Sequence, residues 1–203
     1  MTSVKRMPFA IGAGAVALGS FLAIAYAEGT GKIEGEGKEL VMFTITASNV
    51  YGANQIKGAT AEAEKLGYKL TVFQNNFSQP EQDQQVQQYI ASGAKPAAVI
   101  FWPWVADAAL NDTRLLSKLA PVVQLTQEPN EKSWPFVQAY SGANQILIGE
   151  TLGSTMLKAR DAAKAAGMKF KSDGGNLLVF QHPAGEKTGT ERMKGFMAVT
   201  KDA

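Results

Sequence analysis

The sequence contains no cysteine and only one histidine, His182. The lack of cysteine excludes a disulfide framework, a thiolate zinc site, a cysteine nucleophile and a lipid-anchored N-terminal cysteine. No H-E-x-x-H or G-x-S-x-G motif is present, and no pair of carboxylates has an obvious orienting partner. A lone histidine beside Pro183 is more typical of an ordinary loop residue than of a general base. We therefore expect a protein that is not an enzyme and that carries no metal and no cofactor.

Charge is also scarce. The formal net charge is +2, and charged residues make up 19% of the chain. The lysines and arginines are scattered, with no basic run interleaved with aromatic residues, which argues against nucleic acid as a partner. With 203 residues, 45% of them hydrophobic, the chain is long enough to bury a sizeable core in one domain or two small ones.

Residues 1–27 have the pattern of a secretory signal peptide. Lys5 and Arg6 precede an apolar stretch at residues 9–24, and residues 25–27 (Ala-Tyr-Ala) form a small-x-small cleavage pattern. An uncleaved membrane anchor is the alternative, but the apolar run is shorter than the ~20 residues that a spanning helix needs. Residues 28–37 are rich in glycine and charge and are expected to form a flexible lead-in. We therefore expect a periplasmic or otherwise extracytoplasmic protein.

Strands and helices are predicted to alternate from residue 38 onward. Apolar or alternating runs predict strands at 40–47, 68–73, 97–102, 121–126, 136–140 and 176–180. Helical spacing predicts helices at 55–66, from residue 80, and at 107–119, 145–166 and 192–199. The glutamines at 82, 84, 85, 87 and 88 are expected on the solvated side of the second helix. Strict alternation with short connections predicts an α/β fold with a doubly wound parallel sheet.

Polar and aromatic residues follow the predicted strands, at the edge where open α/β sheets bind their ligands. Amides and hydroxyls suit the rim of an uncharged polyhydroxylated ligand, and aromatic rings suit its C–H surface. The same residue types also cap helices and turns, and the tryptophans alternatively pack against a neighbouring helix. The strand exits are Asn49 with Tyr51, residues 74–77, Trp102 with Trp104, Thr126 with Gln127, and residues 181–182.

The order of these features resembles the type I periplasmic sugar-binding proteins of ABC importers, the ribose-binding-like group related to LacI-type repressor cores. The resemblance rests on the signal peptide, Asn-x-aromatic at 49–51, the helix end at 64–68, the glutamine-rich second helix and residues 191–196 (Glu-Arg-Met-Lys-Gly-Phe). It extends from residue 40 to the end of the sequence. It implies a first ligand-binding lobe at 38–142 and the start of a second α/β lobe at 143–203, incomplete because family members continue through more strand–helix units.

The resemblance also implies roles for individual residues. Asn49 would hydrogen-bond sugar hydroxyls, Tyr51 would stack on the ring, and Arg192 would supply a charged donor from the second lobe. Thr126 and Gln127 stand where family members often place an Asp-Arg pair, a departure that leaves room for a polyol or another small polar solute.

A second aromatic residue is frequent in the family where this chain has Gly52, so stacking is expected from Trp102 or Trp104 instead. The expected function is an extracytoplasmic solute-binding protein that delivers a sugar or polyol to an ABC permease and is monomeric at full length. We also consider a periplasmic lobe that presents its ligand to a chemoreceptor or sensor kinase.

Two further alternatives have less support. An enzyme on a flavodoxin-like sheet would need a phosphate or flavin loop, and the turn at Asn49 lacks the glycines for one. A cytoplasmic LacI-type regulator would need a helix-turn-helix before Leu40, where the signal-peptide pattern stands instead. The sequence leaves open whether the chain is a fragment of a longer binding protein or a truncated product.

Overall fold

The computed structural model describes residues 35–171, 176–180 and 186–201. The predicted signal peptide at 1–27 lies outside the described residues, as do most of the lead-in at 28–37 and the strand exit at 181–182 with His182.

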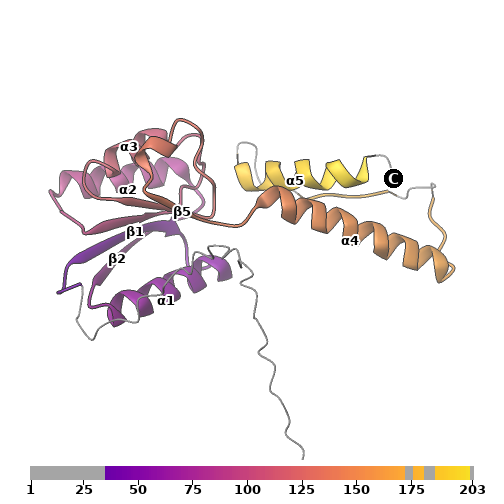
Figure 1. The fold of residues 1–203 in the computed structure, drawn as a ribbon, viewed down its shortest axis with the longest axis horizontal. Helices are drawn as coiled ribbons and strands as arrows, with labels where there is room; N and C mark the ends of the chain where they lie inside the picture. The colour runs from indigo at the N-terminus through magenta and orange to yellow at the C-terminus, as the bar shows by residue number, and fades with distance from the viewer. Residues whose placement is uncertain (1–34, 172–175, 181–185, 202–203) are drawn as a thin grey trace, which may run out of the picture. The chain divides into compact units, whose positions relative to one another are not determined.

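Five parallel strands form one sheet in the order β2-β1-β3-β4-β5. Helix α1 covers one face, and α2 and α3 cover the other (Figure 1). This arrangement confirms the predicted doubly wound sheet. The elements are β1 (Glu39–Ile45), α1 (Val50–Lys65), β2 (Lys69–Asn75), α2 (Gln79–Ala91), β3 (Ala98–Phe101), α3 (Leu110–Leu116), β4 (Val122–Leu125), a 3₁₀ turn (Trp134–Phe136), β5 (Ala139–Ser141), α4 (Gln145–Ala165) and α5 (Lys187–Thr200).

The strand order reverses at β1, which pairs with β2 on one side and with β3 on the other. Such a switch point leaves a crevice at the carboxyl ends of the two diverging units, because their connections run to opposite faces. The segments that leave β1 and β3 therefore border the place where a ligand is expected. They carry Asn49 and Tyr51 after β1, and Trp102 and Trp104 after β3.

Phe43 of β1 lies at the centre of the core. Its ring stacks on Phe73 with centroids 5.0 Å apart and meets the edges of Tyr89 at 5.7 Å and Phe101 at 6.3 Å. These four rings join β1, β2, β3 and α2, so the central strands and one covering helix share one apolar cluster. A rigid core of this kind fixes the strand ends that carry the candidate site.

Local signals explain most element boundaries. The Asn49 side chain accepts hydrogen bonds from the backbone N–H groups of Tyr51 and Gly52, so α1 begins at Val50 rather than at residue 55 as predicted. Gly67 and Gly93 have φ of +77° and +72° and follow α1 and α2, as the sequence predicts.

Helix α5 begins at Lys187 rather than at residue 192 as predicted, and further predicted elements also differ from the structure. Residues 176–180 form no strand, and Leu178 and Phe180 are largely exposed; a strand needs a hydrogen-bonded neighbour, and none pairs with this segment among the described residues. The third helix is limited to Leu110–Leu116. The predicted strand at 136–140 begins only at Ala139, because residues 134–136 form a 3₁₀ turn.

Helices α4 and α5 pack against each other through glycines (Figure 1). A Cβ atom at Gly149 would overlap the carbonyl oxygen of Arg192, and one at Gly195 would overlap the carbonyl oxygen of Ile146. The two backbones therefore approach as closely as glycine allows.

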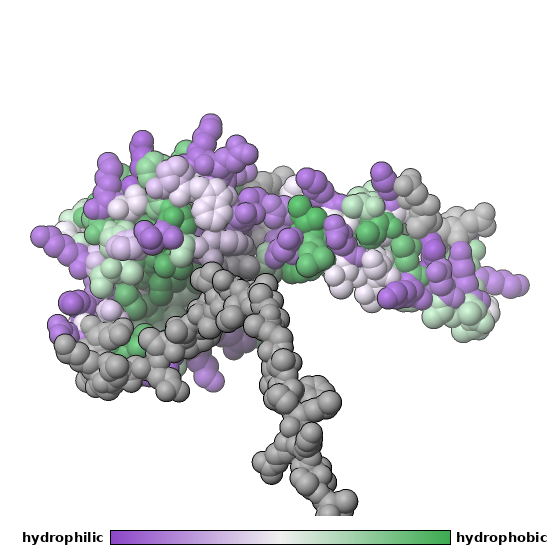
Figure 2. All heavy atoms as spheres, viewed as in Figure 1, coloured by the Kyte–Doolittle hydropathy of each residue, from purple (hydrophilic) through white to green (hydrophobic). Residues whose placement is uncertain are grey.

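Hydrophobic side chains lie among charged ones on the surface of the α4–α5 pair (Figure 2). A groove of about 410 Å³ runs between these helices and residues 176–180, with Leu152, Met156 and Phe196 in its wall. No helix in the described part of the chain is long and apolar enough to cross a membrane.

Candidate ligand-binding site

The exit of β1 is built as a helix cap. Asn49 Oδ1 lies 2.9 Å from the Tyr51 nitrogen and 3.1 Å from the Gly52 nitrogen, so this oxygen is committed to α1. Only the amide nitrogen of Asn49 remains for a ligand. Tyr51 stands in the first turn of α1 and is 55% exposed, so more than half of its surface remains accessible. Gly52 is buried against Ile45 and leaves no room for a side chain.

Two aromatic pairs lie at the carboxyl edge of the sheet. The Tyr51 ring meets Trp102 edge-on, with centroids 5.5 Å apart and planes at 89°. Phe77, after β2, meets Trp104 with centroids 5.2 Å apart and planes at 65°. The exits of β1, β2 and β3 thus form one aromatic rim, in which Trp102 is buried and Trp104 half-buried.

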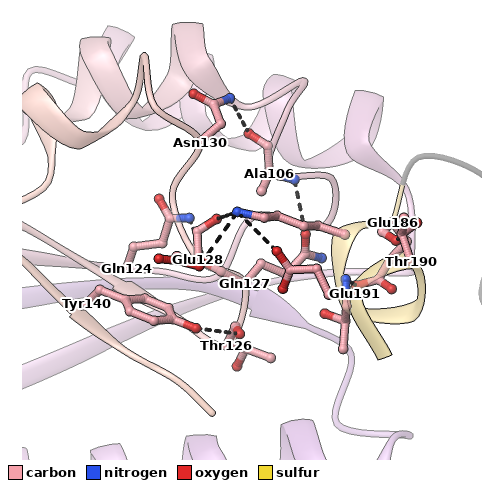
Figure 3. Close-up of polar contacts among 12 residues, drawn as sticks. Ala106, Gln124, Thr126, Gln127, Glu128, Asn130, Tyr140, Glu186, Thr190 and Glu191 are labelled. Atoms are coloured by element: carbon pink, nitrogen blue, oxygen red, sulfur yellow. Dashed lines mark hydrogen bonds and ion pairs between the residues drawn. The ribbon is translucent and has the colours of Figure 1, made fainter. Parts of the chain in front are cut away.

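Amide side chains hold the segment from Trp102 to Ala106. Gln82 of α2 donates to the Trp102 carbonyl at 2.9 Å and accepts from the Trp104 nitrogen at 3.0 Å. Gln127 donates to the Trp104 carbonyl at 2.6 Å and accepts from the Ala106 nitrogen at 3.2 Å (Figure 3). The expectation that Gln82 faces solvent is therefore wrong, since it is fully buried, whereas Gln84, Gln87 and Gln88 are exposed and Gln85 is half-buried.

Thr126 has a left-handed backbone with φ of +66°, which is unusual for a β-branched residue. Its hydroxyl accepts from Gln55 Nε2 at 3.0 Å, and its carbonyl accepts from the Tyr140 hydroxyl at 3.1 Å (Figure 3). Burial, together with the charges of Glu128 and Glu191, raises the pKa of Tyr140 to about 12. Tyr140 therefore remains a hydrogen-bond donor throughout the physiological range.

A small cavity of about 270 Å³ lies where β4 and β5 lead into α4, with Glu128, Tyr140 and Glu191 in its wall. The Lys187 ammonium lies 3.8 Å from the Glu128 carboxylate and 3.5 Å from the Glu191 carboxylate, and it donates to the Glu128 carbonyl at 3.4 Å. Figure 3 shows Glu128 and Glu191 with dashed lines that join both of them to the same side-chain nitrogen. Two carboxylates around one ammonium leave this wall with a net negative charge.

Arg192 lies on α5, where its Nε donates to Gln145 Oε1 of α4 at 2.8 Å, and it borders the α4–α5 groove. No contact found among the described residues links it to the aromatic rim. Gln127 uses both ends of its amide on the backbone of Trp104 and Ala106. The structure brings Asn49, Tyr51, Trp102 and Trp104 to one edge, with Thr126 at the adjacent strand exit.

Sequence reasoning missed Gln55. It stands one helical turn after Tyr51 and therefore on the same face of α1, a signal that was lost because the predicted helix began at Gln55 itself. Gln55 Oε1 and the indole Nε1 of Trp102 are buried, and neither has a hydrogen-bond partner in the described part of the chain. Within those same residues, no group of three or more His, Asp or Glu side chains is placed to hold a metal ion.

Comparison with known proteins gives one family that matches the sequence and many solved structures with a similar fold. The sequence profile of the family described as "Periplasmic binding protein domain" matches residues 40–203. No curated protein sequence gives a significant match.

Three solved structures illustrate the fold. A galactofuranose binding protein has 23% identity and a TM-score of 0.66, with 81% of this chain and 52% of that chain covered. A carbohydrate transporter solute binding protein from Agrobacterium radiobacter, in complex with D-arabinose, has 16% identity and a TM-score of 0.69, with 81% and 53% covered. The XylFII-LytSN complex has 18% identity and a TM-score of 0.67, with 82% and 56% covered. The chain thus spans about half the length of these structures.

Proposed function

The chain belongs to the periplasmic binding protein domain family, as its resemblance predicts, and on this premise we propose that it is an extracytoplasmic solute-binding protein of an ABC importer. Its ligand would be a small uncharged polyhydroxylated molecule, a sugar or a polyol. It would bind that ligand without chemical change and deliver it to a membrane permease. Residues 1–27 would direct export as a signal peptide and would then be removed.

The observation that carries this proposal is the aromatic rim at the switch point of the sheet. Aromatic faces pack against the C–H surface of a sugar, whereas the amides beside them suit its hydroxyls. Tyr51 offers an exposed ring, and Asn49 keeps a free amide nitrogen at the same strand exit. Several structures with the same fold are described with a sugar or glycerol bound, which agrees with this class of ligand.

Two unpaired atoms strengthen the case for a hydroxylated ligand. The Trp102 indole N–H is a donor without an acceptor, and Gln55 Oε1 is an acceptor without a donor, in the described part of the chain. A hydroxyl both donates and accepts, so a polyol supplies either partner. Both atoms are inaccessible in this conformation. Movement of Tyr51, whose ring packs on Trp102, is therefore proposed to open the site.

Binding is proposed to act through closure of two lobes. A ligand that makes contacts only in the closed state shifts the population toward it by its differential affinity for the two states. The described sheet is proposed to supply the contacts on one side of the ligand, and residues from Ala143 onward are proposed to begin the other lobe.

The test is isothermal titration calorimetry of the chain with D-arabinose, D-fucose and glycerol, the small molecules named with the similar structures. We expect at least one to bind with saturable heat. Tyr51→Ala should raise its Kd about tenfold, which corresponds to about 1.4 kcal/mol. Val50→Ala is the matched control, because Val50 is adjacent and 75% exposed and should leave Kd unchanged. Absence of saturable heat with every compound, or equal effects of both variants, would contradict the proposal.

A second candidate function is ligand sensing, in which the closed protein is recognised by a second protein rather than by a permease. The similarity to a structure described as a complex of two proteins favours considering it. Neighbouring genes distinguish the two: permease and ATPase genes favour transport, and a sensor-kinase or chemoreceptor gene favours sensing.

A further inference from the structure

The segment from Trp102 to Ala106 belongs to no helix or strand, yet its backbone is almost fully hydrogen-bonded. Consecutive N–H groups of Trp104, Val105 and Ala106 each donate to a glutamine side chain. The carbonyls of Trp102, Trp104 and Ala106 each accept from a side-chain amide. We call residues 102–106 the indole loop. In most proteins such groups bond to other backbone or to water.

The amides come from two elements that lie far apart in the sequence. Gln79 and Gln82 stand on α2, and Gln127 follows β4. Gln79 Oε1 lies 2.7 Å from the Val105 nitrogen, while its Nε2 lies 2.7 Å from Asp83 Oδ1. Figure 3 shows Gln127 reaching Ala106, with Asn130 bonded to the Ala106 carbonyl beside it. The loop is thus held from both sides.

Each of these three glutamines uses both ends of its amide and is buried, with exposed fractions of 7%, 0% and 2% for Gln79, Gln82 and Gln127. Burying an amide is unfavourable unless its hydrogen bonds are replaced, and here the oxygen and the nitrogen of each amide both have a partner in the loop or in Asp83. An apolar side chain of the same volume would fill the space but would leave the loop's N–H and C=O groups unpaired. The amides therefore fix the loop's conformation as well as filling the core.

The loop's conformation decides where both indoles lie. Trp102 meets Tyr51 from α1, and Trp104 meets Phe77 from the exit of β2. A shift of the loop would break both pairs together. We propose that Gln79, Gln82 and Gln127 are positioning residues, which touch no ligand but hold the indole loop so that Trp102 and Trp104 are presented at the binding edge. This inference rests on the proposed function for its ligand, but the claim that the three glutamines hold the loop is testable without a ligand.

The test compares Gln82→Leu with Gln84→Leu. Both residues stand on α2, but Gln84 is exposed, and no hydrogen bond seen among the described residues joins it to the loop. Both variants are made in a Trp134→Phe background, because Trp134 is 41% exposed and would dominate the quenching signal. Acrylamide quenching of the remaining tryptophans and near-ultraviolet circular dichroism are measured without ligand. D-arabinose affinity is then measured by calorimetry.

For Gln82→Leu we expect the quenching constant to rise about twofold and the near-ultraviolet signal to fall, because the loop opens locally. The Kd for D-arabinose should rise about tenfold, as for a site that is competent about a tenth of the time. Gln84→Leu should leave the quenching constant, the near-ultraviolet signal and the Kd unchanged. Gln79→Leu, at the first residue of α2, is the second variant if Gln82→Leu does not fold. It should likewise raise the quenching constant and the Kd and lower the near-ultraviolet signal.

A folded Gln82→Leu with unchanged quenching overturns the positioning role, even if its melting temperature is lower. A raised Kd with unchanged quenching overturns it as well, because the loop would then be intact. If the parent protein does not bind D-arabinose, that part of the proposed function fails for this ligand, and the quenching comparison alone decides the positioning claim.

Discussion

Asp112 on α3 carries a carboxyl group that is 3% exposed and hydrogen-bonded to Asp83 of α2. Burial, followed by the hydrogen bond and the negative charge of Asp83, raises the pKa of Asp112 to about 7. Gln79 donates to Asp83 from the other side, at 2.7 Å. This carboxyl pair therefore lies next to Gln79, one of the amides that hold the indole loop. Below neutral pH the carboxyl pair is stable because Asp112 retains a proton.

The pH dependence of stability follows from this raised pKa. Unfolded Asp112 titrates near 3.8, so between about pH 4 and pH 7 the folded state holds more protons than the unfolded state. The contribution is complete below the unfolded pKa and is lost as the pH rises through 7, with an upper limit of about 4 kcal/mol. We expect Asp112→Asn to remove this loss and to be more stable than the parent at pH 8. Urea unfolding of both proteins at pH 5 and pH 8 measures the free energy of unfolding on which this comparison depends.

The control for this prediction is Asp107→Asn, since Asp107 is exposed and forms no ion pair that is seen among the described residues. It should leave the difference between the two pH values unchanged. An Asp112→Asn variant that loses as much stability between pH 5 and pH 8 as the parent would show that the carboxyl pair does not retain its proton.

At the residue scale, the sequence predicted which residues lie at the edge of the sheet better than it predicted which hydrogen bonds their atoms form. It placed Asn49, Tyr51, Trp102 and Trp104 at the carboxyl edge of the sheet, because residues after parallel strands share one edge. It left helix capping open as an alternative role for Asn49, which the structure shows, but it could not predict that Gln127 faces inward. Gln82 and Gln84 look alike in sequence, and only the helical phase against the neighbouring loop distinguishes them.

Gly195 of α5 and Gly149 of α4 set the distance between these two helices. A Cβ at Gly195 would overlap the backbone of Ile146, and backbone atoms cannot move aside as a flexible side chain can. We expect Gly195→Ala to destabilise the α4–α5 pair by about 1–3 kcal/mol, the usual effect of overpacking. Hydrogen exchange of the amides of residues 187–200, compared with those of β1, measures it, and only the former should lose protection.

Gly58, inside α1, is the matched control. Nothing lies within 4 Å of a Cβ built there, and alanine is favoured over glycine inside a helix by about 0.5–1 kcal/mol. Gly58→Ala should therefore stabilise α1. Unchanged protection of α5 in Gly195→Ala would contradict the close packing of the two helices.

At the element scale, local signals predicted what local interactions determine. The glycine ends of α1 and α2 and the buried run of β1 appear where the sequence places them. The strand predicted at 176–180 is absent because pairing is a tertiary interaction that an apolar run cannot supply by itself. The start of α1 was placed too late because Ser48 to Tyr51 reads equally well as a turn or as a cap.

At the scale of the whole molecule, ligand binding is proposed to occur at the switch point of one parallel sheet. The similar structures are about one and a half times as long as this chain. The proposed ligand contacts of Asn49, Tyr51, Trp102 and Trp104 all come from one sheet. An affinity measured for this chain therefore tests the contribution of these four residues.

The most direct test is a titration of the ¹⁵N-labelled chain, in which the indole N–H signals of its three tryptophans are monitored by NMR. The added compounds are D-arabinose, D-fucose and glycerol, and Trp102→Phe and Trp104→Phe assign the signals. We predict that the Trp102 and Trp104 signals shift in a saturable way with at least one compound, the Trp102 signal most, because its N–H has no acceptor among the described residues. If no signal shifts with any compound, or if only the Trp134 signal does, the proposed binding edge is wrong.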